Sequence, residues 1–123
     1  MADAETPSLR GVLIGTSPDG YAEMRRFYSE ILGLRPRSDR PGFVNFEWGG
    51  VRLTLNLHSR VKGSTTEPHR ILLNFGVTDL ASWHQRMLES EVVCHREPCP
   101  EPWGGLVATY SDPDGNLVQL LQF

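Results

Sequence analysis

The chain has 123 residues, of which 39% are hydrophobic and 22% are charged. This length and composition fit one compact domain with a core of its own, and they exclude a disordered or fibrous chain. The 12 lysines and arginines are scattered among 15 acidic residues, so no basic stripe favours nucleic acid as a partner. No stretch is long and apolar enough to span a membrane, so we expect no membrane partner.

The N-terminal segment and the two cysteines bear on the compartment. MADAETPSLRG carries acidic residues where a secretory signal carries basic ones. Cys94 and Cys99, in CHREPC, have the atoms for a zinc site but lack a second cluster of ligands. We therefore expect two reduced thiols in a cytoplasmic protein.

The first half of the chain predicts a strand, a helix and three further strands. LRGVLIGT is an apolar, β-branched run of strand length, and the turn-like SPDG follows it. In YAEMRRFYSEILGL the apolar residues recur at helical spacing, and Gly33 falls where a left-handed cap would end a helix. LRPRSDR predicts a weak edge strand, and Gly49-Gly50 predicts a hairpin between strands in FVNFEW and VRLTLNLH.

VRLTLNLH alternates between apolar and polar residues, which predicts a strand with two different faces. We expect the apolar face to meet the helix and the polar face to line a cleft. The two faces carry Val51, Leu53, Leu55 and Leu57 on one side, and Arg52, Thr54, Asn56 and His58 on the other.

The second half of the chain repeats this order after a connector at residues 59–68. RILLNFGV predicts a strand, and Thr78 or Asp79 is expected to cap a helix in DLASWHQRMLES. EVVCHRE predicts another weak strand, CPEPWGG a loop, and LVATYS and NLVQLLQF two strands that DPDG joins. We therefore predict a single α+β domain of two βαβββ modules, at about 9–58 and about 69–123. Two such sheets, side by side and curled, would enclose an open, barrel-like cleft.

Four motifs in this order carry a family resemblance: FYSEILGL, VTDL, PWGG and DPDGN. Together they resemble the vicinal oxygen chelate superfamily, which has the glyoxalase/bleomycin resistance fold. That superfamily includes glyoxalases, extradiol dioxygenases, fosfomycin-modifying enzymes and bleomycin-resistance proteins. The resemblance covers the chain from about residue 9 to its end, and it implies the two-module architecture just described.

The resemblance also implies where a metal would be bound, because the metal enzymes of the superfamily take His and Glu ligands from the first and last strand of each module. The first-strand positions fall here on Val12 or Leu13 and on Leu72. The last-strand positions fall on Thr54 and Gln119. Aliphatic side chains cannot ligate a metal, and a hydroxyl with an amide offers neither an anion nor an imidazole. We therefore expect no metal and no other cofactor.

The leading hypothesis is a metal-free protein that sequesters a small organic molecule in the cleft, as bleomycin-resistance proteins do. The resemblance implies a homodimer in which two chains share the cleft. No motif identifies a catalytic residue. The expected ligand-binding residues are the polar Thr54, Asn56, Asn74, Tyr110 and Gln119 and the aromatic Phe46, Trp48 and Trp103. For the two tryptophans, packing in the protein or at a dimer contact is the alternative.

Strand alternation puts Gln119 on one face with Leu117 and Leu121, and the resemblance makes that face the cleft. The alternative function is a divalent-metal-dependent lyase, isomerase or dioxygenase of the same superfamily, for which His58, Glu47 and Gln119 are the first candidate ligands. A third hypothesis is an accessory module whose own side chains fill the cleft.

Overall fold

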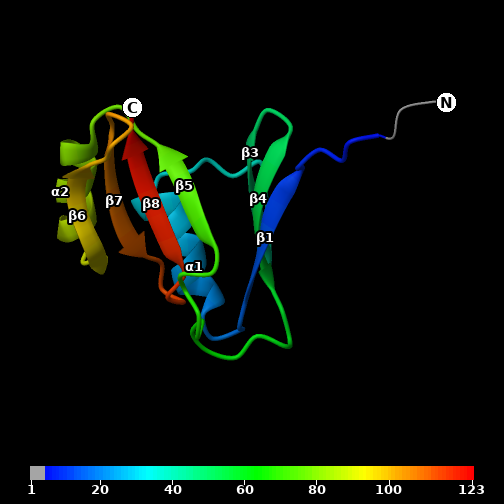
Figure 1. The fold of residues 1–123 in the computed structure, drawn as a ribbon. Helices are drawn as coiled ribbons and strands as arrows, with labels where there is room; N and C mark the ends of the chain where they lie inside the picture. The colour runs from blue at the N-terminus through cyan, green and yellow to red at the C-terminus, as the bar shows by residue number, and fades with distance from the viewer. Residues whose placement is uncertain (1–4) are drawn as a thin grey trace.

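The computed structural model describes residues 5–123 and contains two separate four-stranded sheets (Figure 1). Their strand orders are β1-β4-β3-β2 and β5-β8-β7-β6, with one parallel pair in each, β1 with β4 and β5 with β8. The predicted α+β fold of two βαβββ modules is confirmed, and the sheets do not close into a barrel. The elements are β1 (Gly11–Thr16), α1 (Tyr21–Arg26), the π-helical turn η1 (Phe27–Ile31), β2 (Ser38–Arg40), β3 (Phe43–Trp48), β4 (Val51–Leu57), β5 (Leu72–Gly76), α2 (Leu80–Glu89), β6 (Cys94–Pro100), β7 (Leu106–Ser111) and β8 (Leu117–Gln122).

The first helix buries one apolar face and ends at the predicted glycine. Its regular part widens into η1, where the backbone N–H of Leu32 donates to the carbonyl of Phe27 at 2.9 Å, five residues back. Gly33 then takes a φ of +71°, a left-handed conformation that glycine adopts without the steric cost of a side chain. At α2 the cap is Asp79, whose carboxylate accepts a hydrogen bond from the backbone N–H of Ser82.

The DPDG turn also joins the two modules. Asp112 is 4% exposed and accepts hydrogen bonds from Asp114 N, Asn116 N and Asn116 Nδ2. It also accepts one from Tyr28 Oη of the first module at 2.7 Å. Close by, Thr16 Oγ1 donates to the carboxylate of Asp114 at 2.7 Å. Burial raises the pKa of Asp112, and the hydrogen bonds that its carboxylate accepts from Tyr28, Asn116 and Asp114 oppose that shift.

One hydrophobic core is shared by both modules. It combines residues of α1 and η1 with the apolar faces of β3 and β4 from the first module and of β7 and β8 from the second, together with Leu80 and Met87 of α2. The helix-side faces of the two sheets therefore pack against one shared hydrophobic core, because joining two apolar surfaces removes the most apolar area from water. The polar face of each sheet lies on the side opposite this core, and we call these the open faces.

β6 differs from its prediction. It was expected to end at Glu97, but it runs from Cys94 to Pro100 and pairs with β7 through two register shifts. Pairing with a neighbouring strand outweighs the weak propensity of this proline-containing segment. Within residues 5–123, no helix is long and apolar enough to cross a membrane.

Candidate functional site

The open face of the first sheet carries a row of neutral polar groups. The strand register aligns Leu13 of β1 with Thr54 of β4, Thr54 with Asn45 of β3, and Asn45 with Ser38 of β2. Asn45 is buried, and its side-chain oxygen accepts hydrogen bonds from Ser38 N at 3.1 Å and Ser38 Oγ at 3.2 Å. Thr54 and Asn56 are half-buried on the same face, whereas Leu13 is 59% exposed. This face therefore offers hydroxyl and amide groups beside an exposed aliphatic side chain, with the ion pair of Glu47 and Arg52 at its hairpin end.

The open face of the second sheet carries a similar row. Asn74 of β5 is aligned with Gln119 of β8, and Gln119 with Thr109 of β7. The side-chain nitrogen of Gln119 donates to Thr109 Oγ1 at 3.2 Å. Leu117 and Leu121 follow the alternation of β8 onto this face, as predicted. Asn74 is exposed, so the row is polar and accessible at its β5 end.

Two predicted ligand-binding residues, Phe46 and Tyr110, lie on the core side of their strands. Phe46 is 1% exposed and Tyr110 is 0% exposed, and both belong to the shared core. Tyr110 Oη is 2.7 Å from His84 Nδ1, and burial raises the pKa of Tyr110. Successive strand residues point to opposite faces, so the open-face positions belong to their neighbours Asn45 and Thr109. Neither residue was predicted from the sequence, although the alternation of both strands indicates their face.

The two exposed tryptophans lie apart from both polar rows. Trp48 ends β3 on the helix side of the first sheet, and its ring centroid is 5.9 Å from that of Phe75 in β5. Trp103, in the loop before β7, has its ring centroid 5.3 Å from that of Phe123. Each tryptophan therefore has a packing partner within the chain, in keeping with the packing alternative.

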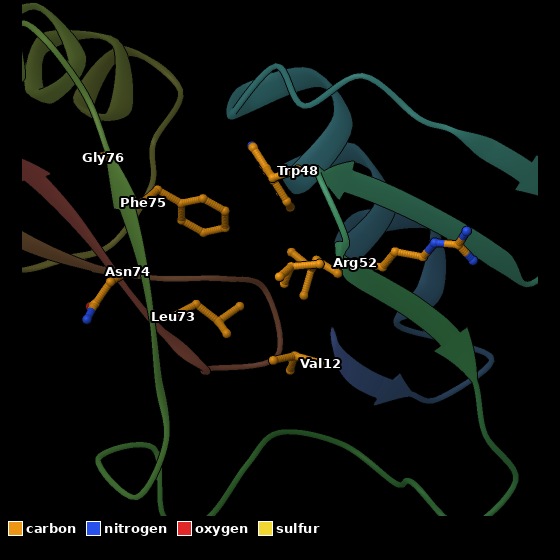
Figure 2. A pocket seen from close by; sticks show the side chains of 9 residues that line it. Val12, Trp48, Arg52, Leu73, Asn74, Phe75 and Gly76 are labelled. Atoms are coloured by element: carbon orange, nitrogen blue, oxygen red, sulfur yellow. The ribbon is translucent and has the colours of Figure 1, made fainter. Parts of the chain in front are cut away.

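A groove of about 310 Å³ lies between the two sheets, on their helix sides (Figure 2). Its lining is mostly apolar, and Figure 2 shows the side chains of Arg52 and Asn74 pointing away from it. The lining residues are Val12, Trp48, Val51, Arg52, Leu53, Leu73, Asn74, Phe75 and Gly76.

The residues at the expected ligand positions do not fit a divalent metal ion. On the open faces these positions hold Leu13, Thr54, Leu72 and Gln119, none of which supplies an anion or an imidazole. Among residues 5–123, no three His, Cys, Asp or Glu side chains are grouped so that they could hold a metal ion.

The alternative ligand set is also dispersed. Glu47 lies between Arg37 and Arg52, each at 3.0 Å. The hydrogen bond from Arg52 is the main cause that lowers the pKa of the Glu47 carboxyl, and Arg37 lowers it further. His58 lies six residues beyond Arg52, about 20 Å along an extended strand. Its Nδ1 accepts a hydrogen bond from Arg60 N at 3.1 Å. Gln119 belongs to the other sheet, so the structure does not bring these three candidates together.

Comparison with known proteins agrees with this architecture. A family model for the Glyoxalase/Bleomycin resistance protein/Dioxygenase superfamily matches residues 16–120, and the chain belongs to that superfamily. No curated protein matches the chain.

Several solved structures are similar in fold. A glyoxalase-related enzyme from Fulvimarina pelagi is 20% identical with a TM-score of 0.77, and the match covers 96% of this chain and 89% of that one. Lactoylglutathione lyase from Agrobacterium tumefaciens is 21% identical with a TM-score of 0.71, covering 97% of this chain and 96% of that one. A family member from Burkholderia phytofirmans PsJN is 19% identical with a TM-score of 0.73, covering 94% and 98%. At such identities the likeness concerns the fold.

Proposed function

We propose that this chain is a metal-free binding protein that sequesters a small organic molecule against its open faces. The observation that carries the proposal is the chemistry of the two aligned rows. Thr54 and Asn45 on one sheet, and Asn74 and Gln119 on the other, supply donors and acceptors without charge. Such groups orient an organic ligand, whereas a divalent ion needs anionic or imidazole ligands to offset its desolvation.

The ligand site is completed by a second copy of the chain. Within one chain the helix-side faces of the two sheets share a core, so neither open face is covered by the other sheet. The exposed Leu13, on the edge strand β1 of the first open face, leaves apolar area for a partner or ligand to cover. We therefore propose a cytoplasmic homodimer in which the first sheet of one copy faces the second sheet of its partner. The two free thiols, Cys94 and Cys99, support a reducing compartment.

Two measurements test whether the protein is free of metal. One is elemental analysis of protein purified without added metal, and the other is a thermal-shift screen with zinc, nickel, manganese and iron. We expect no stoichiometric metal and no large stabilisation by any of these ions. Stoichiometric metal, or a large stabilisation by one ion, would overturn the proposal in favour of a metal-dependent lyase, isomerase or dioxygenase.

Native mass spectrometry against a library of metabolites and natural products tests the binding part. A compound retained by the wild type is expected to bind Gln119→Leu roughly tenfold more weakly, because an unpaired polar group in a contact costs about 1–3 kcal/mol. Gln85→Leu is the matched control, since Gln85 is exposed on α2 and contacts Glu89. Equal affinity of both variants would contradict the assignment of the open face.

A further inference from the structure

A second row of side chains crosses the open face of the first sheet, next to the row of Thr54. The strand register aligns Gly15 of β1 with Asn56 of β4. It also aligns Asn56 with Phe43 of β3, and Phe43 with Arg40 of β2. Phe43 and Asn56 are half-buried, whereas Arg40 is exposed on the edge strand β2. The open face therefore presents an amide, an aromatic ring and a guanidinium side by side.

The ring of Phe43 holds Arg40 in position. The guanidinium carbon of Arg40 lies over this ring, 4.5 Å from its centroid. The attraction between a cation and an aromatic face orients a long side chain that is otherwise free to move in solvent. Among residues 5–123, no carboxylate forms an ion pair with Arg40. A fixed guanidinium is therefore left with donors for an anion.

Other arginines near the open faces already have acidic partners. Arg37 and Arg52 share the carboxylate of Glu47, each at 3.0 Å, and Arg96 of β6 pairs with Glu101 at 2.6 Å. Because two guanidiniums share one carboxylate, the first open face has a surplus of positive charge, although the whole chain has a formal net charge of -3. A local surplus of this kind attracts anions to the face that carries it.

A second copy of the chain is a poor source of the missing anion. In the proposed homodimer the first sheet faces the second sheet of the partner, and β5, β7 and β8 of that sheet contain no Asp or Glu. Glu97, in the irregularly paired edge strand β6, is the one acidic residue in its four strands. The anion that pairs with Arg40 is therefore expected to come from the ligand.

The connector limits where that ligand lies. A Cβ added to Gly15 would lie 3.2 Å from Val61 Cγ2 and 3.4 Å from the Cβ of His58, so the connector covers the row at β1. The row is open from β4 to β2. Neighbouring strands are about 4.8 Å apart, so this distance is roughly 10 Å, which suits a molecule of two fused rings.

We infer that the ligand of the open faces is an aromatic anion, whose carboxylate or similar oxyanion pairs with Arg40 while its rings lie against Phe43 and Asn56. This inference deepens the proposed function and rests on it. The rows of Thr54 and Gln119 orient the ligand through neutral hydrogen bonds, whereas Arg40 selects for its charge.

The test compares 2-naphthoate with 2-naphthamide, two probes with the same rings and different charge. By calorimetry we expect the wild type to bind 2-naphthoate roughly tenfold more tightly, because a hydrogen bond between ions is stronger than a neutral one. Arg40→Gln is expected to abolish this preference by weakening the binding of 2-naphthoate alone. Arg26→Gln is the matched control, since it removes the same charge from an exposed position on α1, on the helix side of the sheet. Should circular dichroism show that Arg40→Gln is unfolded, Arg40→Met replaces it with the same expectation.

Three results would overturn the inference. One is equal affinity of the wild type for the two probes, or no binding of 2-naphthoate. Another is a preference that survives Arg40→Gln. The third is a dimer that Arg40→Gln weakens in sedimentation and Arg26→Gln does not, because Arg40 would then contact a second copy.

Gln119→Leu distinguishes a failure of this inference from a failure of the proposed function. If the two probes bind equally and both bind more weakly to Gln119→Leu, the anionic ligand is refuted and the open-face site stands. If the binding of both probes is unchanged in Gln119→Leu, the proposed open-face site is refuted, and the inference with it.

Discussion

The hydrogen bond from Tyr28 to Asp112 is the clearest place to measure how strongly the two modules are held together. Tyr28 lies in the helix of the first module and is 0% exposed, and Asp112 begins the turn before the last strand of the second module. The substitution Tyr28→Phe removes the hydroxyl and leaves the ring in the core. It therefore isolates one bond between the modules with little change in packing.

The expected loss of stability in Tyr28→Phe follows from the hydrogen bonds around the Asp112 carboxylate. A hydrogen bond to a charged group contributes about 1.5–3 kcal/mol. Asp112 retains its donors from the backbone of Asp114 and from Asn116, so it is not left unpaired. We expect Tyr28→Phe to lower the free energy of unfolding by about 2 kcal/mol at neutral pH.

This effect depends on pH in a defined direction. Burial raises the pKa of Asp112 above its ordinary value of 3.8, whereas the hydrogen bond from Tyr28 opposes the shift. Because the folded-state pKa is raised, ionisation of Asp112 lowers stability as pH rises from 3.8 through the folded-state pKa. Tyr28→Phe raises that pKa further, so its cost is smallest where Asp112 is protonated and grows as the pH rises across this window.

Urea denaturation at several pH values measures the effect, with the slope of the transition compared between variants. Tyr21→Phe is the matched control on the same helix, because the buried Tyr21 Oη has no hydrogen-bond partner among residues 5–123. That control is expected to be neutral or slightly stabilising. A cost below about 0.5 kcal/mol for Tyr28→Phe, or a cost independent of pH, would refute the reasoning.

Two further predictions concern helix ends, and denaturation measures both. Asp79→Ala is expected to cost about 1 kcal/mol because it removes the cap on Ser82 N, whereas Asp79→Asn keeps an acceptor and most of the stability; equal losses would contradict this. Gly33→Ala is expected to cost about 1–2 kcal/mol through backbone strain at φ +71°, since the added Cβ would meet only Arg86 Nη2, at 3.5 Å. An unchanged stability would show that the helix end adopts another conformation at no cost.

The sequence alone determined the local structure and much of the chemistry of the open faces. Alternation in VRLTLNLH and NLVQLLQF identified the faces that carry Thr54 and Gln119, because side chains in a strand follow a period of two. Glycine at position 33 marked the helix end through a backbone conformation that other residues rarely adopt. These features depend on neighbours in the chain, so a local pattern was sufficient to predict them.

The tertiary structure decided which strand faces meet and what lies between them. Phe46 and Tyr110 were expected at the ligand, but they are buried in the core that the two modules share. The groove brings Trp48 to Phe75, residues from different sheets with no common pattern in the sequence. Each sheet has an apolar face that any other apolar surface could cover. The hydrophobic pattern of the sequence does not specify which surface does so. Only the packing of the two modules makes that choice, by burying the apolar faces together and leaving the polar rows of Thr54 and Gln119 outside.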